Sequence, residues 1–346
     1  MTSSAHHGLL GRLAAGENLS VDETTTAVDG IMQGSWSEGE IALFLTGLRD
    51  KGETPQEVAG AAAAMRRHMR PIRTTRTGVI DTCGTGGIGS HLFNVSTTAA
   101  IVTAAVGVPV AKHGNRRVTS QSGSADVLRE LGVNVEADVP VVEACLEELG
   151  LCFCFAPLLH QAMKHVGPVR QKLGGRTIFN LLGPLTNPAG AKLQLLGVGR
   201  AELRPLLAEA LQLLDVERAV IVSGDDGLGE VTIAGTSSIT EVRRTPLGEH
   251  TITVTTWTPA DFGLPTSSLE TIGVDSPNAS AAIIRDVLAG KTGPARDIVI
   301  ANAAAAVWTA GRAETPLAAA TLVREAIDSG AAREVLAKLV AKTNSK

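Results

Sequence analysis

Polar helix starts and apolar runs alternate along the first seventy residues, a pattern that predicts a group of helices. Ser20, Ser37 and Thr54 are each followed three residues later by a glutamate. This is the spacing of a capping box, in which side chains satisfy the free backbone donors of a helix start. Apolar residues in the run 41–48 fall on more than one helix face, more than a single core requires. We therefore expect a small helical domain that also contacts a partner subunit.

From Gly78 onward the pattern changes to short β-branched runs separated by helical stretches. Alternation of this kind is typical of a parallel sheet covered by helices. Further β-rich runs precede helices that begin near 279, 295 and 317. The sequence therefore predicts an α/β fold with a mostly parallel sheet. The expected strands lie at 79–82, 108–111, 133–135, 151–155, 219–222, 239–242 and 251–257.

Between 166 and 188 the alternation is broken by proline and glycine residues, among them Pro168, Gly174-Gly175 and Asn187-Pro188. Such residues leave room only for short helices. We expect the chain to return here to the helical domain. The predicted domains are a helical domain at 1–72 with a crossing segment at about 168–190, and an α/β domain made of 73–167 and 191–346.

Composition and charge narrow the class of protein. A chain of 346 residues exceeds the usual size of a single core, and its net charge of -4 gives no overall attraction to nucleic acid or to an anionic membrane. No apolar stretch approaches the ~20 residues of a membrane span, and no secretion signal is evident. The 4 cysteines lack paired Cys-x-x-Cys spacing, so we expect free thiols. These features predict a cytoplasmic protein with small-molecule ligands.

A glycine-rich segment at 84–89 follows the first predicted strand and precedes Asn94 at the start of an alanine-rich helix. A turn without side chains and a helix amino terminus both present backbone N–H groups to a phosphate. Ser96 and Thr97 add hydroxyl groups. A tight turn needed only for helix packing has the same pattern, so this segment alone leaves both interpretations open.

A basic segment, Lys112 to Arg117, follows the next predicted strand and should emerge at the same edge of the sheet, where open α/β folds bind ligands. Lys112 would act there as a point charge for phosphate. A second hydroxyl-rich segment, 119–124, comes directly after it. The alternative is that Lys112, Arg116 and Arg117 are solvated loop charges.

Taken together, these segments resemble the family of anthranilate phosphoribosyltransferases. The resemblance implies a helical domain joined by several crossings to an α/β domain, and a homodimer formed through the helical part. It also implies transfer of the phosphoribosyl group of phosphoribosyl diphosphate to anthranilate in tryptophan biosynthesis, with Mg²⁺ as cofactor. The matching segments are Gly84-Thr85-Gly86-Gly87, Asn94-x-Ser96-Thr97, Lys112 to Arg116, Pro168-Val169-Arg170 and Phe179 to Pro188.

The resemblance also implies roles for individual residues. Ser96 and Glu230 match the Mg²⁺ ligands, and the forked guanidinium of Arg170 suits the carboxylate of anthranilate. The alternatives are structural hydrogen bonds for His113 and His160, and an interdomain ion pair for Arg170. The expected anthranilate site is Gly84, His113, Asn115, His160 and Arg170. The expected phosphoribosyl diphosphate site is Gly84, Thr85, Gly86, Gly87, Asn94, Ser96, Thr97, Lys112, Ser120 and Ser124.

Two departures from the family pattern concern the diphosphate and Mg²⁺ side of the site. Ile88 and Gly229 stand where the family usually has aspartates. Either Asp225 or Asp226 compensates for the missing carboxylates, or the metal is held more weakly. The alternative functions are a pyrimidine nucleoside phosphorylase and, because of these two losses, a non-catalytic relative that binds a ligand. The basic segment and Asn187-Pro188 favour the transferase over the phosphorylase.

Overall fold

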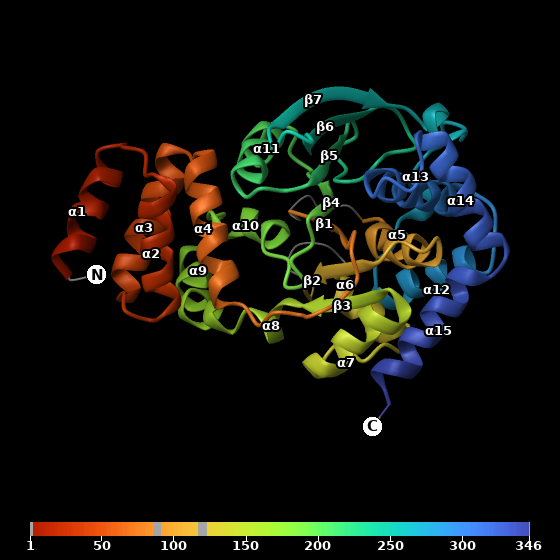
Figure 1. Ribbon diagram of the computed structural model, residues 1–346, viewed down its shortest axis with the longest axis horizontal. Coiled ribbons are helices and arrows are strands. Elements are labelled where there is room, and N and C mark those ends of the chain that lie inside the picture. Colours follow the sequence, from red (N-terminus) through yellow and green to blue (C-terminus); the bar gives the residue numbers. More distant parts are fainter. Residues whose placement is uncertain (1–2, 86–90, 117–122, 346) are drawn as a thin grey trace.

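The molecule has a helical part at the amino terminus and an α/β part that contains the rest of the chain (Figure 1). The computed structural model describes residues 3–85, 91–116 and 123–345. Ser20, Ser37 and Thr54 each accept a hydrogen bond from the glutamate three residues on, and that carboxylate accepts one in return, so the predicted capping boxes are confirmed. The helices are α1 (Ser3–Ala14), α2 (Val21–Met32), α3 (Glu38–Lys51) and α4 (Pro55–His68).

A seven-stranded sheet with the order β3-β2-β1-β4-β5-β6-β7 forms the centre of the α/β part. Neighbours among β1 to β5 pair in parallel, whereas β6 is antiparallel to β5 and β7. The predicted mostly parallel sheet is therefore confirmed. The strands are β1 (Ile80–Gly84), β2 (Val110–Gly114), β3 (Leu151–Phe155), β4 (Leu193–Gly197), β5 (Arg218–Gly224), β6 (Ser237–Arg244) and β7 (His250–Trp257).

The strand predictions are wrong in three details. The run 133–135 forms no strand, although Val133 and Val135 are buried in the core. The central strand β4 is missing from the prediction because its Leu-Gln-Leu-Leu-Gly run has no β-branched residue, and leucine favours helices as readily. In addition, β2 continues past its β-branched run, so Lys112 and His113 lie within the strand and not in the loop after it.

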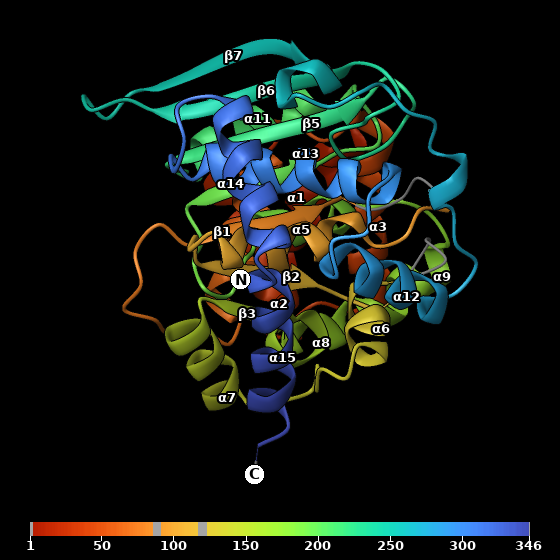
Figure 2. The same cartoon turned by 90° about the vertical axis from the view of Figure 1, so that its right-hand side faces the viewer.

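Helices cover both faces of the sheet. Val220 and Val222 of β5 join one core with α5 and α13, whereas the alternate residues Ala219 and Ile221 join a second core with α11 and the helical part. Figure 2 looks onto the first face, with α5, α13, α14 and α15 toward the viewer. The helices of the α/β part include α5 (Val95–Ala105), α6 (Ser124–Glu130), α7 (Val139–Ala144), α11 (Leu203–Leu213), α12 (Pro277–Leu288), α13 (Pro294–Thr309), α14 (Pro316–Asp328) and α15 (Ala331–Thr343).

Three short helices, α8 (Ala156–Leu159), α9 (Gly167–Leu173) and α10 (Phe179–Leu182), follow β3. α9 contacts α3, and α10 contacts α4, so this segment packs on the helical part before the chain enters β4. The four cysteines are free thiols, as expected. No helix in the described residues is long and apolar enough to span a membrane.

Candidate functional site

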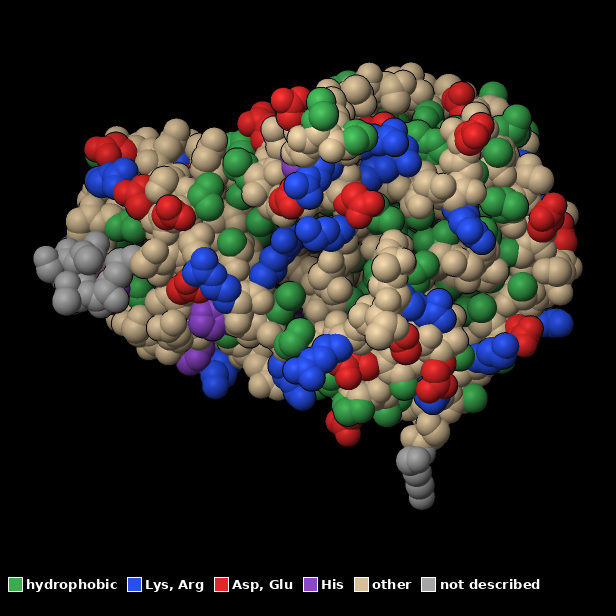
Figure 3. Space-filling view, viewed as in Figure 1, with side chains coloured by type: hydrophobic (Ala, Val, Ile, Leu, Met, Phe, Trp, Pro, Cys, Tyr) green, Lys and Arg blue, Asp and Glu red, His purple; other side chains and the backbone are tan. Residues whose placement is uncertain are grey.

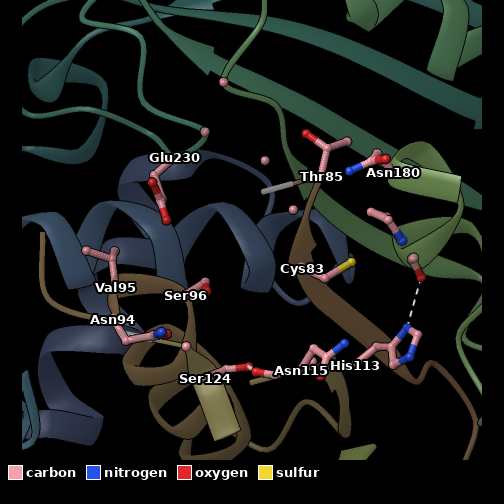
Figure 4. Close-up of a pocket in the computed structure, with 18 of the residues that line it drawn as sticks. Cys83, Thr85, Asn94, Val95, Ser96, His113, Asn115, Ser124, Asn180 and Glu230 are labelled. Atoms are coloured by element: carbon pink, nitrogen blue, oxygen red, sulfur yellow. Dashed lines mark hydrogen bonds between the residues drawn. The ribbon is translucent and has the colours of Figure 1, made fainter. Parts of the chain in front are cut away.

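A cavity of about 510 Å³ lies at the carboxyl ends of β1, β2 and β4. The start of α5 and the short helices α9 and α10 complete its wall, and the side chains in Figure 4 point into this shared space. Lysine and arginine side chains flank a hollow near the middle of the molecule in Figure 3. The residues that line the cavity include Cys83, Gly84, Thr85, Asn94, Ser96, Lys112, His113, Asn115, Ser124, Arg170, Arg176, Asn180, Gly197, Gly229 and Glu230.

Three glycines from different chain segments form the floor of the cavity. Thr85 N–H donates to the Gly197 carbonyl at 3.0 Å. A Cβ atom at Gly197 would lie 1.7 Å from the Gly229 carbonyl oxygen, and one at Gly84 would lie 2.9 Å from the Gly197 oxygen. Because these glycines have no side chains, the backbones of β1, β4 and the loop after β5 can come into direct contact. Of the expected glycine segment, Gly86, Gly87 and Ile88 lie outside the described residues.

The start of α5 is built around Asn94. Its side-chain Oδ1 accepts from Thr97 N–H at 3.1 Å, and its own N–H donates to Ser280 Oγ at 2.9 Å. Ser96 lines the cavity, whereas Thr97 is buried and does not. The partial positive charge of this helix end suits an anion.

Lys112 is buried below the start of α5. Its ammonium group donates to the Thr82 carbonyl oxygen at 2.5 Å and to Ser96 Oγ at 3.2 Å. Burial lowers the pKa of Lys112, and the charges of Asp81 and Glu230 act in the opposite direction. The alternative of a solvated loop charge is therefore wrong for Lys112. Arg116 is exposed and paired with Glu136, but it also lies over the Phe155 ring and lines the cavity, whereas Arg117 lies outside the described residues.

Glu230 is a half-buried carboxyl group in the same wall. Burial raises its pKa to about 7, the charge of Lys112 opposes this shift, and that of Asp226 adds to it. Asp226 itself accepts from Leu228 N–H at 3.0 Å and from the Thr232 hydroxyl, and so holds the loop before Glu230. Neither Asp225 nor Asp226 is among the described residues that line the cavity. The structure therefore does not place either of these two aspartates at the cavity.

His113 and His160 form a neutral hydrogen-bonded pair. His113 Nδ1 lies 2.9 Å from the Gly183 carbonyl oxygen, which can only accept, so Nδ1 carries the hydrogen. His113 Nε2 lies 3.2 Å from His160 Nε2, and the Thr186 backbone accepts a hydrogen bond from the His160 ring. Burial lowers the pKa of His113 to about 3 and that of His160 to about 4. His113 lines the cavity, whereas His160 is buried and is not among the described lining residues.

This histidine pair predicts a loss of stability in mild acid. The unfolded chain binds protons at both imidazoles below a pH of about 6.5, whereas the folded chain binds them only near pH 3 to 4. The free energy of unfolding should therefore fall as the pH drops from 6.5, by up to ~2 kcal/mol per histidine at pH 5. Urea denaturation of the parent and of His160→Gln at pH 7 and pH 5 tests this. The variant should show a shallower pH dependence, and His91→Gln, at an exposed site, should match the parent.

Arg170 of α9 is half-buried beside α10. Its Nη2 donates to Asn180 Oδ1 at 3.3 Å, and its guanidinium carbon lies 5.8 Å from the centre of the Phe179 ring. Burial lowers the pKa of Arg170, and no carboxylate in the described part of the chain pairs with it. The interdomain ion pair considered from the sequence is therefore not formed there.

Asn115 and Ser124 lie together in the cavity wall. Ser124 Oγ donates to the Asn115 carbonyl oxygen at 3.3 Å, and both residues line the cavity. Ser120 lies outside the described residues. Sequence reasoning assigned no role to Arg176 or Asn180, which also line the cavity. The signal for Asn180 was present, because it is a polar residue inside the apolar run from Ile178 to Leu182.

Models of known protein families match both the helical part and the α/β part of the chain. The model described as "Glycosyl transferase family, helical bundle domain" matches residues 8–69. The model described as "Glycosyl transferase family, a/b domain" matches residues 76–333. The two matches together span both the helical part and the α/β part.

Several relatives and solved structures share nearly the full length. A protein of Moorella thermoacetica named anthranilate phosphoribosyltransferase is 48% identical, with 97% of this chain and 98% of the relative covered. The crystal structure of the Thermus thermophilus protein of that name matches with a TM-score of 0.90 at 41% identity, over 97% of this chain and 99% of that one. The protein of that name from Saccharomyces cerevisiae, in complex with PRPP and Mg, matches with a TM-score of 0.89 at 28% identity, over 100% and 99% of the two chains.

Proposed function

Because this chain belongs to the anthranilate phosphoribosyltransferases of the glycosyl transferase family, we propose that it transfers the phosphoribosyl group of phosphoribosyl diphosphate to the amine of anthranilate. The products are N-(5-phosphoribosyl)anthranilate and diphosphate. One observation supports this most directly. A single cavity joins Lys112 and a helix start whose partial positive charge suits an anion to Arg170, which has no acidic partner among the described residues.

The donor would bind along the strand ends and the start of α5. The phosphoribosyl diphosphate residues that the structure describes are Gly84, Thr85, Asn94, Ser96, Thr97, Lys112 and Ser124, and all of them except Thr97 line the cavity. The partial positive charge of the helix start suits phosphate oxygens, and Lys112 adds a positive charge from below. Thr97 contributes through its N–H, which holds the side chain of Asn94.

Ser96 and Glu230 fit the role of Mg²⁺ ligands. Both offer oxygen atoms to the cavity, and Figure 4 shows the two side chains directed toward the same region. Hard cations prefer such ligands, and Mg²⁺ keeps water and substrate phosphates in its remaining positions. The raised pKa of Glu230 agrees with this role, because a nearby cation would restore its charged form. When bound, Mg²⁺ stabilises the negative charge of the departing diphosphate.

In this reaction the protein mainly has to orient the two substrates and stabilise the charge that develops. The acceptor is a free aromatic amine, so no strong nucleophile has to be generated. Arg170 would hold the carboxylate of anthranilate and so direct its amine toward the ribose, while Lys112 stabilises the departing phosphate charge. Neutral His113 and Asn115 would border the aromatic ring. The Gly183 carbonyl would keep His113 in the tautomer that carries its hydrogen on Nδ1, with His160 packed against the other ring nitrogen.

Gly229→Asp should lower the Mg²⁺ concentration needed for half-maximal activity, by about tenfold if the new carboxylate acts on the metal's outer shell. A Cβ atom there lies 3.2 Å from the backbone nitrogens of Val198 and Gly199, so some strain accompanies the gain. Gly229→Ala carries the same strain without the charge and is the matched control. Ile88→Asp in the same background should add to the effect. Identical Mg²⁺ dependence of the aspartate and alanine variants would show that the missing carboxylate is not limiting.

We further propose that the chain is a cytoplasmic homodimer that acts in tryptophan biosynthesis. Leu43 on α3 supports the dimer, because its side chain is 61% exposed while Ile41, Phe44 and Leu45 of the same helix are buried. The domain division proposed is 1–72 with the crossing segment at about 168–190, and 73–167 with 191–346. The contacts of α9 with α3 and of α10 with α4 support it. Sedimentation of the parent and of Leu43→Glu would test the interface.

A fluorescence assay separates this function from its rivals. The parent should consume anthranilate only when phosphoribosyl diphosphate and Mg²⁺ are both present. Cleavage of pyrimidine nucleosides that depends on phosphate would instead identify a phosphorylase. Binding of phosphoribosyl diphosphate without turnover at any Mg²⁺ concentration would identify a non-catalytic relative.

A further inference from the structure

Asn180 holds the guanidinium group of Arg170 at the cavity wall. Asn180 Oδ1 accepts from Arg170 Nη2 at 3.3 Å and from Thr177 N–H at 3.0 Å. Phe179, the preceding residue of α10, places its ring 5.8 Å from the guanidinium carbon. Two adjacent side chains of one short helix therefore restrain the arginine without neutralising its charge.

The hydrogen bonds also settle which way the amide of Asn180 faces. Thr177 N–H and the guanidinium group can only donate, so the atom that meets them must be the amide oxygen. The amide nitrogen then lies on the other side of the group. Figure 4 shows this nitrogen directed toward Thr85 and the cavity, which Asn180 lines. No hydrogen-bond acceptor for it is found among the residues that the structure describes.

From this geometry we infer that Asn180 is a positioning and specificity residue, which aligns Arg170 and offers its own N–H group to the second oxygen of the acceptor's carboxylate. This inference rests on the proposed function, since it concerns the same acceptor site. A restrained arginine loses less side-chain entropy when a ligand binds. A neutral amide is also required, because a carboxylate at this position would pair with Arg170 and repel the ligand's negative charge.

Asn180→Asp is the most informative substitution. Its side-chain oxygen still accepts from Thr177 N–H and from Arg170, so the start of α10 keeps its hydrogen bonds. The change removes only the donor that faces the cavity and adds a negative charge. We expect the KM for anthranilate to rise roughly 10- to 100-fold, with little change in the KM for phosphoribosyl diphosphate and no fall in melting temperature.

A second acceptor separates specificity from a structural role. 2-Aminobenzamide carries the same amine but a neutral amide in place of the carboxylate, so it is not repelled by the new charge. The ratio of kcat/KM for 2-aminobenzamide to that for anthranilate should rise at least tenfold in Asn180→Asp. Thr177→Val, which removes a hydroxyl 3.5 Å from Asn180 Oδ1 but keeps the N–H group, should leave the ratio unchanged.

The outcomes distinguish this inference from the proposed function. A parent enzyme that uses anthranilate and an Asn180→Asp variant with an unchanged acceptor ratio would overturn the inference alone. A parent that does not use anthranilate would overturn both. If Asn180→Asp fails to fold, Asn180→Ser removes the amide donor without adding charge. It should then raise the KM for anthranilate selectively, and an unchanged KM would again overturn the inference.

Discussion

Arg170→Ala should raise the anthranilate concentration needed for half-maximal rate by about 10- to 100-fold, while that for phosphoribosyl diphosphate stays nearly constant. A hydrogen bond to a charged group contributes about 1.5–3 kcal/mol, which corresponds to this range. The effect should be selective because Arg170 lies on α9, whereas the phosphate groups are expected at the strand ends and at α5.

The stability of the Arg170 variant provides an independent check. Arg170 is desolvated and has no acidic partner in the described residues, so its removal should not lower the melting temperature. Arg170→Lys keeps the charge but loses the fork of donors, and we expect it to restore only part of the affinity for anthranilate. Equal losses for both substrates, or a large loss of stability, would show that Arg170 has a structural role instead.

Lys112→Ala should weaken the binding of phosphoribosyl diphosphate by about 1.5–3 kcal/mol, as measured by calorimetry. The lysine reaches Ser96 from below and is the cation whose charge acts on both Asp81 and Glu230. Without it, these acidic groups are left uncompensated and an incoming phosphate meets more negative charge.

Two further variants show whether the effect is local. Lys112→Met keeps most of the apolar volume, so it should bind the donor as poorly as Lys112→Ala while preserving more stability. Lys192→Ala removes an exposed lysine just before β4, at the end of the strand away from the cavity, and should bind like the parent. An unchanged donor affinity in Lys112→Met would contradict the assigned role.

Much of the fold follows from local sequence signals. The capping boxes at Ser20, Ser37 and Thr54 depend on residues three positions apart, so they can be recognised without tertiary information. The edge of the sheet that carries the site follows from the succession of strands and helices. Strand β4 could not be recognised, because its leucines become a strand only through pairing with β1 and β5.

The site was predicted less completely than the fold, because several of its contacts are tertiary. His160 meets His113 across 47 residues of sequence, and Lys112 meets Ser96 across 16. The restraint of Arg170 by Asn180 depends on how two short helices pack, which no periodicity reveals. The close approach of Gly229 to Gly197 likewise depends on a loop conformation. Because that conformation is set by tertiary contacts, the sequence alone could not show how little space a side chain at Gly229 would find.

The central claim is that one cavity joins a phosphoribosyl group to anthranilate. Phosphorus NMR of the parent protein with phosphoribosyl diphosphate, anthranilate and Mg²⁺ tests it most directly. The account predicts that diphosphate and N-(5-phosphoribosyl)anthranilate appear in equal amounts, and that diphosphate release stops when anthranilate is left out. Release of diphosphate that does not depend on anthranilate, or no product across a Mg²⁺ titration, would contradict it.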